Sequence, residues 1–265
     1  MSQLILATTT NDLSLPLFFH NQPNNLGVKV ILYEDSMEHL SSIQADVDSY
    51  TVVYFRDPFN APKNQDWEIK IKPLLEKIQK NNLPSIDKIT KLDDFLIEDK
   101  WRQYQCYKSL MPKTQLLDEA ASYNPSIHFL KKRISSRSKG VLFSTDSIPP
   151  SQFDAYIVQE KLEIKEEYRI FILFGQIIQP AEIKSSKTKT TKVKVNRDKN
   201  LEIDPPLAQF VTKIMHKTDV DFAGLDIALT QSGEYKLIEV NRSPQFKAFF
   251  EITGINLASK LLSHY

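Results

Sequence analysis

Residues 224–254 read GLDIALTQSGEYKLIEVNRSPQFKAFFEITG, and this stretch decides how the rest of the chain is interpreted. Two runs rich in β-forming residues, 222–229 and 235–240, lie on either side of Ser232-Gly233. A serine–glycine pair between two such runs is typical of a tight turn. The stretch therefore predicts a β-hairpin.

Three oxygen-bearing side chains meet on one face of this predicted hairpin. Counting back from a turn centred on Ser232-Gly233 places Asp226 opposite Glu239. Side chains two residues apart share a strand face, so Asn241 joins Glu239. Hard oxygen donors without His or Cys suit magnesium or manganese rather than zinc. The hairpin predicts a divalent-cation site that can hold nucleotide phosphates; the alternative is separate polar residues on a half-exposed surface.

The composition describes a globular chain without a strong charge bias. It has 265 residues, 41% of them hydrophobic, which is enough for a sizeable core in two or three lobes. Lys plus Arg total 34 and Asp plus Glu total 33, so net charge gives no argument for a nucleic-acid partner. The single cysteine, Cys106, favours a reducing compartment. No apolar run approaches the ~20 residues of a membrane span, and the uncharged opening is too short for a signal peptide, so we expect a cytoplasmic protein without a membrane partner.

The first part of the chain alternates between strands and helices. Its predicted elements are three short buried strands and a helix, at residues 4–7, 28–33, 51–55 and 67–80. This order predicts an α/β lobe. Ligand loops in open α/β sheets follow the carboxyl ends of strands, so Arg56 and Asp57 are candidate substrate contacts. The alternative is a structural salt bridge in that loop.

The remainder of the chain predicts short strands and three helices. The helices are expected at residues 98–110, 207–217 and 256–262. The strands are expected at residues 141–143, 156–159, 168–174 and 176–183, with Gly175 as the turn between the last two. Residues 184–199 are basic and poor in large apolar side chains, which indicates a loop or an extended hairpin.

A basic, serine-rich loop follows the predicted strand that carries Lys131. Ser136, Ser138 and Gly140 lie in its sequence SSRSKG, residues 135–140. Small hydroxyl residues and a glycine allow backbone N–H groups to approach an anion. Lys131 is close enough along the chain to reach the same phosphates as a point charge. The alternative is an ordinary solvated turn.

A second group of polar residues lies on the strands that follow. The apolar strand 156–158 ends at Gln159, where backbone groups can pair with the edge of an adenine. Glu167 and Arg169 are two residues apart and share a strand face. A carboxylate accepts hydrogen bonds from ribose hydroxyls, and a guanidinium braces phosphate. The alternative is a cross-strand ion pair on an exposed face, which stabilises a protein little.

In this order the segments resemble the ATP-grasp superfamily, and within it the RimK-type carboxylate–amine ligases. The match is closest in GLDIA, LIEVNRSPQF and TGINLA, and it continues backwards through EEYRI, VQEKLE, the loop after Lys131, MPKTQ and EDKWRQYQ. It covers residues 98–265, whereas the first lobe matches only in general pattern. The terminal part is also similar to the ligases that cyclise microviridin-type peptides.

The resemblance implies an ATP-grasp fold of the α/β class with α+β lobes. Residues 1–97 are expected to form a Rossmann-like pre-ATP-grasp domain, and residues 98–265 the ATP-grasp domain. Within the latter, a small central lid lobe spans about residues 113–160, and a C-terminal catalytic lobe with an antiparallel sheet spans about residues 161–265. Dimers and tetramers are common in the family, so a homo-oligomer is a possible state.

The resemblance also implies roles for the nucleotide-binding residues. Lys100 and Lys131 are expected to contact the ATP phosphates or the adenine side. Glu160, at the hinge between lobes, and Leu162 are expected to bind adenine through backbone atoms. Glu167 is expected to hold the ribose.

The remaining implied roles concern phosphoryl transfer. Arg169 is expected to brace the phosphates, while Asp226, Glu239 and Asn241 coordinate magnesium. Such enzymes phosphorylate a substrate carboxylate with ATP, and an amine then displaces phosphate to give an amide. This chemistry needs positioning and charge neutralisation rather than an acid–base residue.

The sequence departs from the family pattern in three places. The phosphate loop has one glycine, and Ser138 stands where a glycine, which tolerates positive φ, is common. Arg242 stands where many relatives carry a small residue. The stretch IKSSKTKTTKVKVN lacks the expected Arg–Ser–Asn pattern. There Lys184 and Lys187 are candidates to hold the acyl phosphate or an acidic substrate, and a solvated basic loop is the alternative.

Three functions remain open from the sequence. The first is an ATP-dependent ligase that joins a small-molecule or peptide carboxylate to an amine. The second is a peptide-modifying ligase that forms side-chain esters or amides. The third is a nucleotide-binding regulatory module without turnover, for which the glycine-poor loop is the best support.

Overall fold

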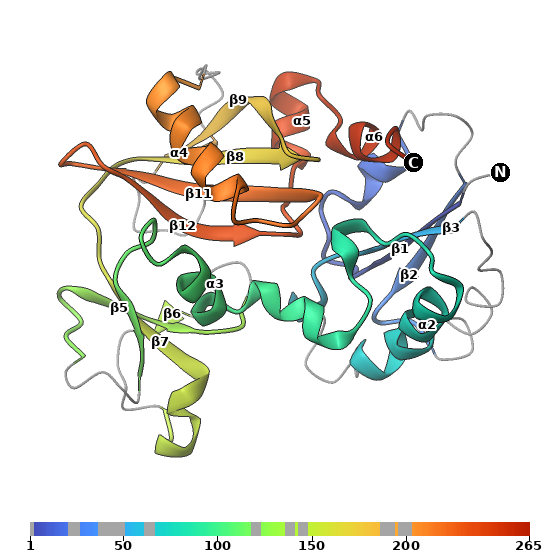
Figure 1. Ribbon diagram of the computed structural model, residues 1–265, viewed down its shortest axis with the longest axis horizontal. Coiled ribbons are helices and arrows are strands. Elements are labelled where there is room, and N and C mark those ends of the chain that lie inside the picture. Colours follow the sequence, from blue (N-terminus) through green and yellow to red (C-terminus); the bar gives the residue numbers. More distant parts are fainter. Residues whose placement is uncertain are drawn as a thin grey trace. The chain divides into compact units, whose positions relative to one another are not determined.

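Figure 1 shows the computed structural model of the protein, which divides into two compact units. The first unit contains residues 1–95, 220–222 and 242–265, and the second contains residues 96–219 and 223–241. The domain limits expected from the sequence, with a boundary at residues 97–98, stay a prediction. The structure describes residues 3–20, 27–36, 51–60, 67–117, 123–135, 141–142, 148–185, 194–195 and 203–265.

The first unit is built on a parallel three-stranded sheet. Strand β1 (Gln3–Thr8) lies between β2 (Gly27–Leu32) and β3 (Thr51–Phe55) and pairs in parallel with both. Every residue of β3 is buried, as are residues 4–8 of β1. Strands covered on both faces read as continuous apolar runs, which is how the sequence presents them. The predicted α/β lobe is confirmed.

Helix α2 (Trp67–Asn81) completes the core of this unit. Its buried residues recur at helical spacing and share one hydrophobic cluster with the three strands; they are Ile71, Leu74, Leu75 and Ile78. The described residues up to 98 also form short 3₁₀ helices, namely η1 (Leu15–Phe18), η3 (Pro58–Asn60), η4 (Ile86–Lys88) and η5 (Leu92–Glu98).

Two C-terminal helices belong to the first unit. Helix α5 (Lys247–Thr253), which the sequence analysis missed, ends at Gly254, whose φ of 71° is the left-handed conformation that glycine adopts readily. Helix α6 (Leu257–Leu262) begins as expected at Asn256, whose side-chain oxygen accepts the N–H groups of Ala258 and Ser259.

The second unit contains a five-stranded sheet in the order β10-β9-β8-β11-β12. The pairs β8–β9, β9–β10 and β11–β12 are antiparallel. The predicted turn at Gly175 is confirmed, with a φ of 71° at that residue. The strands are β8 (Ile164–Leu173), β9 (Gln176–Ser185), β10 (Lys194–Val195), β11 (Phe222–Thr230) and β12 (Tyr235–Asn241).

A smaller antiparallel sheet in the same unit has the order β4-β7-β5-β6. Its buried residues Leu130 and Val158 form a small core together with Leu117 and Ile148. The strands are β4 (Thr114–Leu116), β5 (His128–Lys132), β6 (Val141–Leu142) and β7 (Tyr156–Glu160).

In its described residues, the second unit has the helices α3 (Lys100–Tyr107), the 3₁₀ helix η6 (Pro150–Ala155) and α4 (Pro205–Met215). Helix α3 is shorter than the predicted 98–110. It begins at Lys100 because the Asp99 side chain caps it by accepting the Trp101 N–H at 2.8 Å. Within the described ranges, no helix combines the length and the apolar character that crossing a membrane requires.

The β11–β12 hairpin differs from the prediction at its turn but not at its polar pair. Its loop has three residues, 231–233, between Thr230 and Glu234, and Gly233 takes a φ of 84°. The longer loop shifts the register by one residue. A β-bulge between Asp226 and Ile227 shifts it back, so Asp226 pairs with Glu239. The predicted register at the polar pair is confirmed, although the two-residue turn from which it was counted is wrong.

Candidate active site

The two carboxylates of the hairpin are held as a cross-strand pair. Asp226 on β11 is 6% exposed, and Glu239 on β12 lies opposite it. Asn241, two residues further along β12, pairs with Gly224. The alternative of unrelated polar residues on a half-exposed hairpin is therefore excluded for Asp226, which is buried.

Arg169 reaches Asp226 from the neighbouring strand β8. Its Nε lies 2.8 Å from Asp226 Oδ1 and its Nη2 lies 2.8 Å from Oδ2, which is the bidentate geometry of a strong charge-assisted pair. Burial by itself would lower the pKa of Arg169, but the charges of Asp226, Glu182 and Glu239 outweigh it and raise the pKa above its usual value. Arg169 thus stays a cation throughout the accessible pH range.

Lys100 brings a second positive charge to this site from the first turn of α3. Its Nζ lies 3.5 Å from Glu239 Oε1 and donates to the Ser135 carbonyl at 2.7 Å. The start of the helix is tied to the end of β5, because Asp99 forms an ion pair with Arg133 and the Lys100 N–H donates to the Arg133 carbonyl. These contacts fix the position of Lys100 at the start of α3.

Lys131 is the third cation of the site, and its pKa is lowered, whereas that of Arg169 is raised. It lies on β5 and donates from Nζ to Gln159 Oε1 at 2.6 Å, while Gln159 Nε2 donates to Thr114 Oγ1 at 3.0 Å. Burial lowers the pKa of Lys131 to about 8; Glu239 opposes this shift and the nearby charge of Lys100 adds to it. Electrostatic coupling to both residues places Lys131 in the same cluster.

The β7–β8 connection contains two backbone groups that a ligand could bind, the Glu160 carbonyl and the Leu162 N–H. The Glu160 N–H donates to the Lys113 carbonyl at 2.9 Å, so that donor is already used. Among the described residues, the Leu162 N–H has no hydrogen-bond partner. A carbonyl oxygen at Glu160 and an open N–H at Leu162 match the amino group and ring nitrogen on the edge of an adenine.

The other residues expected to bind nucleotide lie close in the fold or outside the described ranges. Glu167 on β8 pairs with Lys184 on β9, and its charge acts on Lys131. The backbone of Lys184 is therefore beside the site. Ser136, Ser138 and Gly140 of the predicted phosphate loop lie outside the described residues, and so does Lys187.

Two residues at this site were missed by the sequence analysis. Phe129 lies two residues before Lys131 on β5, is 36% exposed, and has the ammonium groups of Lys131 and Lys161 within 5.3 Å and 5.1 Å of its ring. Its signal was the spacing of two, which puts Phe129 and Lys131 on one strand face. Glu182 pairs with Arg169 across β8 and β9 and is 8% exposed; a lone glutamate in AEIK gave no signal.

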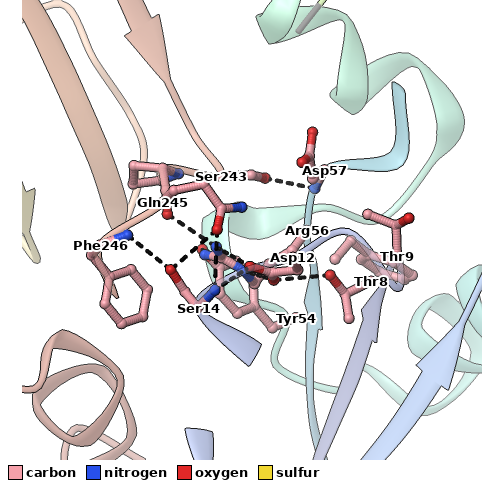
Figure 2. A network of polar contacts seen from close by, with 12 residues as sticks. Thr8, Thr9, Asp12, Ser14, Tyr54, Arg56, Asp57, Ser243, Gln245 and Phe246 are labelled. Carbon is pink, nitrogen blue, oxygen red and sulfur yellow. Dashed lines mark hydrogen bonds and ion pairs between the residues drawn. The ribbon is translucent and has the colours of Figure 1, made fainter. Parts of the chain in front are cut away.

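Arg56 has a structural role in the first unit, and the backbone of Asp57 joins the same network. The Arg56 side chain is completely buried, with Nε 2.8 Å from Asp12 Oδ2 and Nη2 3.0 Å from the Pro244 carbonyl. The Asp57 N–H donates to Ser243 Oγ at 2.9 Å. Figure 2 shows that the network joins the loops after β1 and β3 to the segment after β12. For Arg56, the salt-bridge alternative is the correct one.

The donor set fits a hard divalent cation. No group of three or more His, Cys, Asp or Glu side chains suited to a metal occurs in the described part of the chain. Asp226 and Glu239 with the Asn241 amide are instead two carboxylates and a neutral oxygen, the mixture that Mg²⁺ accepts while keeping waters and phosphate oxygens. Both carboxylates contact basic side chains, so cation binding would compete with Arg169 and Lys100.

The family can be read from the same segments. A family model described as a RimK-like ATP-grasp domain matches residues 130–265, just over half of the chain. The chain belongs to the RimK-like ATP-grasp family. Members of this family are ATP-dependent ligases, and magnesium is typical of them.

Individual relatives of this RimK-like chain are distant in sequence. Glutamate--LysW ligase ArgX of Sulfurisphaera tokodaii is 27% identical over 117 residues, which cover 43% of this chain and 42% of that protein. The chain is thus matched to less than half the length of that curated relative.

Solved structures match the whole RimK-like chain. The ATP-grasp ligase PsnB, solved with a minimal precursor, gives a TM-score of 0.68 at 12% identity and covers 100% of this chain and 98% of its own. The macrocyclase MdnB from Microcystis aeruginosa MRC gives a TM-score of 0.66 at 11% identity, covering 100% and 99%. At these identities the likeness shows the fold, and it confirms the predicted ATP-grasp class.

Proposed function

We propose that this chain is an ADP-forming ligase that phosphorylates a substrate carboxylate with ATP and couples the acyl phosphate to an amine. The observation that carries the proposal is the clustering of Arg169, Lys100 and Lys131 around the Asp226–Glu239 pair. A site for phosphoryl transfer needs this combination of cations for the phosphates and carboxylates for a metal.

Each residue of the cluster has a separate task in this proposal. Arg169 and Lys131 neutralise the phosphate oxygens, Arg169 as a flat fork and Lys131 as a point charge. Asp226, Glu239 and Asn241 would hold Mg²⁺, which supplies charge neutralisation between the phosphates when bound. Lys184 is proposed to steady the acyl phosphate from β9.

The proposed reaction balances in two displacements. A carboxylate oxygen attacks the γ-phosphorus, and the bond from that phosphorus to the ADP oxygen breaks. The amine nitrogen then attacks the acyl carbon, the bond from that carbon to the phosphate oxygen breaks, and the amine proton passes to solvent. The products are an amide, ADP and phosphate.

Adenine recognition is proposed to use the β7–β8 connection. The Glu160 carbonyl would accept from the adenine amino group and the Leu162 N–H would donate to the ring nitrogen. Gln159 accepts a hydrogen bond from Lys131 and is itself held by Thr114. Glu167 would accept a hydrogen bond from the ribose, and the ring of Phe129 would contact the base. The loop with Ser136, Ser138 and Gly140 is proposed to cover the phosphates.

The pH dependence of nucleotide binding tests the role of Lys131. A pKa lowered to about 8 means that its ammonium loses the proton well below the usual lysine range. The Kd for ADP should therefore rise with pH, by up to about tenfold per pH unit above pH 8. Calorimetry at pH 7, 8 and 9 measures this change.

Two variants make the assignment specific. Lys131→Arg keeps a charge at every pH and should flatten the dependence, whereas Lys132→Arg, at the exposed neighbouring residue, should leave it as in the native protein. An equally steep rise in Kd in Lys131→Arg would show that another group titrates.

A peptide substrate is the second candidate, because peptide-bound ligases match the fold over nearly their full length. Under this proposal a side-chain carboxylate of a precursor peptide is phosphorylated and then joined to a side-chain amine or hydroxyl. A screen of amino acids and short peptides by ADP release, followed by mass spectrometry, separates the substrates. Loss of one water mass within a peptide supports the peptide-modifying reaction, and a condensed pair of small molecules supports the first. Nucleotide binding without ADP release under every acceptor would favour a regulatory module.

A further inference from the structure

Strand β12 lies at the end of its sheet, so no other strand of the described residues pairs with its outer edge. Backbone groups on such an edge still need hydrogen-bond partners where they are buried. The segment around α3 supplies them. The Leu237 N–H donates to the Leu110 carbonyl at 2.8 Å, and the Val240 peptide groups bond to the side chain of Gln103.

The Gln103 amide pairs with Val240 as a second strand would. Its Oε1 accepts the Val240 N–H at 3.0 Å, and its Nε2 donates to the Val240 carbonyl at 2.8 Å. Its second N–H group donates to the Ile97 carbonyl at 3.0 Å. The residue is 3% exposed, so water cannot easily replace these bonds. The amide of Gln103 therefore uses its oxygen and one N–H group to bind the edge of β12 and its other N–H group to bind Ile97.

This contact matters because Val240 lies between Glu239 and Asn241 on β12. The Val240 N–H belongs to the peptide unit that follows Glu239, and its carbonyl belongs to the peptide unit that precedes Asn241. One side chain thus holds both peptide planes that connect Val240 to the two proposed metal ligands of β12. A strand residue turns its side chain when its flanking peptide planes turn.

We propose that Gln103 is a positioning residue for the divalent-cation site, acting through the backbone of β12. This inference rests on the proposed function, because it assumes that Glu239 and Asn241 bind Mg²⁺. Metal ligands work only when the groups behind them fix their orientation, and losing such a supporting contact typically weakens metal binding tenfold to a hundredfold.

The test compares ADP binding with and without Mg²⁺ in Gln103→Met. Methionine matches glutamine in length and helix propensity but has no hydrogen bond to offer. Calorimetry in excess Mg²⁺ and in EDTA gives two Kd values, whose ratio is the gain due to the metal. We expect Gln103→Met to cut that gain by roughly tenfold or more while its Kd in EDTA stays near that of the native protein.

Gln105→Met is the matched control, because Gln105 lies on the same helix and is exposed; it should keep the full gain. A uniform structural defect would weaken ADP binding in EDTA as strongly as in Mg²⁺. That result, or an unchanged gain, would overturn the role of Gln103. If Gln103→Met shows no cooperative thermal unfolding, Gln103→Glu serves instead. It keeps the acceptor for Val240 and removes both donors, and it should also lose part of the gain.

The effect of Mg²⁺ on ADP binding by the native protein shows whether the inference about Gln103 or the proposed function has failed. If Mg²⁺ gives the native protein no gain in ADP affinity, the metal role of the hairpin fails, and the inference about Gln103 fails with it. The other case is that the native protein and Gln105→Met both gain ADP affinity from Mg²⁺. If Gln103→Met, or Gln103→Glu in its place, then shows the same full gain, only the inference about Gln103 fails.

Discussion

Replacing Asp226 with asparagine and Glu239 with glutamine in one variant should lower the rate of ADP release by about a thousandfold. The amides keep the shape of the side chains but remove both charges that would bind the cation. A metal in phosphoryl transfer contributes several kcal/mol to stabilising the transition state, and about 4 kcal/mol corresponds to a thousandfold change in rate. Release of ADP is measured with an acceptor identified in the substrate screen.

The same variant removes the carboxylates that form ion pairs with Arg169 and Lys100. Thermal unfolding must therefore accompany the rate measurement, so that lost folding is not mistaken for lost chemistry. Glu234→Gln is a suitable control, since Glu234 is exposed beside the same hairpin and contacts Lys236; it should keep full activity. Turnover at the native rate in the double variant would rule out this site.

Asp12→Asn should lower the free energy of unfolding by about 3–5 kcal/mol, the usual cost of removing one member of a buried ion pair. Arg56 is completely buried, and Asp12 supplies the charge that faces it at 2.8 Å. The other groups that the structure describes around Arg56 are neutral, namely the Tyr54 hydroxyl, the Pro244 carbonyl and the rings of Phe18, Tyr54 and Phe246. Urea unfolding followed by circular dichroism measures the loss.

A second substitution shows whether the charge itself is responsible. Adding Arg56→Met to Asp12→Asn removes the unpaired cation, so the double variant should be more stable than Asp12→Asn alone. Asp93→Asn, at an exposed residue of the same unit, should leave the unfolding midpoint unchanged. If Asp12→Asn unfolds at the native midpoint, the network in Figure 2 does not carry the stability assigned to it.

The regular elements were predictable because their signals are local. The three parallel strands, helix α2 and the β11–β12 pair appear as apolar runs or alternating patterns that survive in the fold. Helix α5 was missed because its seven residues follow Pro244 and carry no cap signal: its N-cap, Phe246, makes no side-chain hydrogen bond. Its formation depends on burying Phe249.

The pairing of Asp226 with Glu239 shows where local reasoning needs the tertiary structure. A count from the turn gave the right partners only because the β-bulge compensates a loop that is one residue longer than predicted. Bulges leave no clear mark in sequence, since they arise from how a strand must bend against its neighbours.

By itself, the chain of residues determined the alternating first lobe, the polar pair on the last hairpin, and the order of segments by which the family was recognised. Only the tertiary structure decided that Arg56 is a buried structural charge, that Lys131 lies where its pKa falls, and that Gln103 closes the edge of β12. The reason is physical. Periodicity and turn chemistry act between residues near in sequence, whereas burial and charge pairing depend on side chains brought together from distant segments.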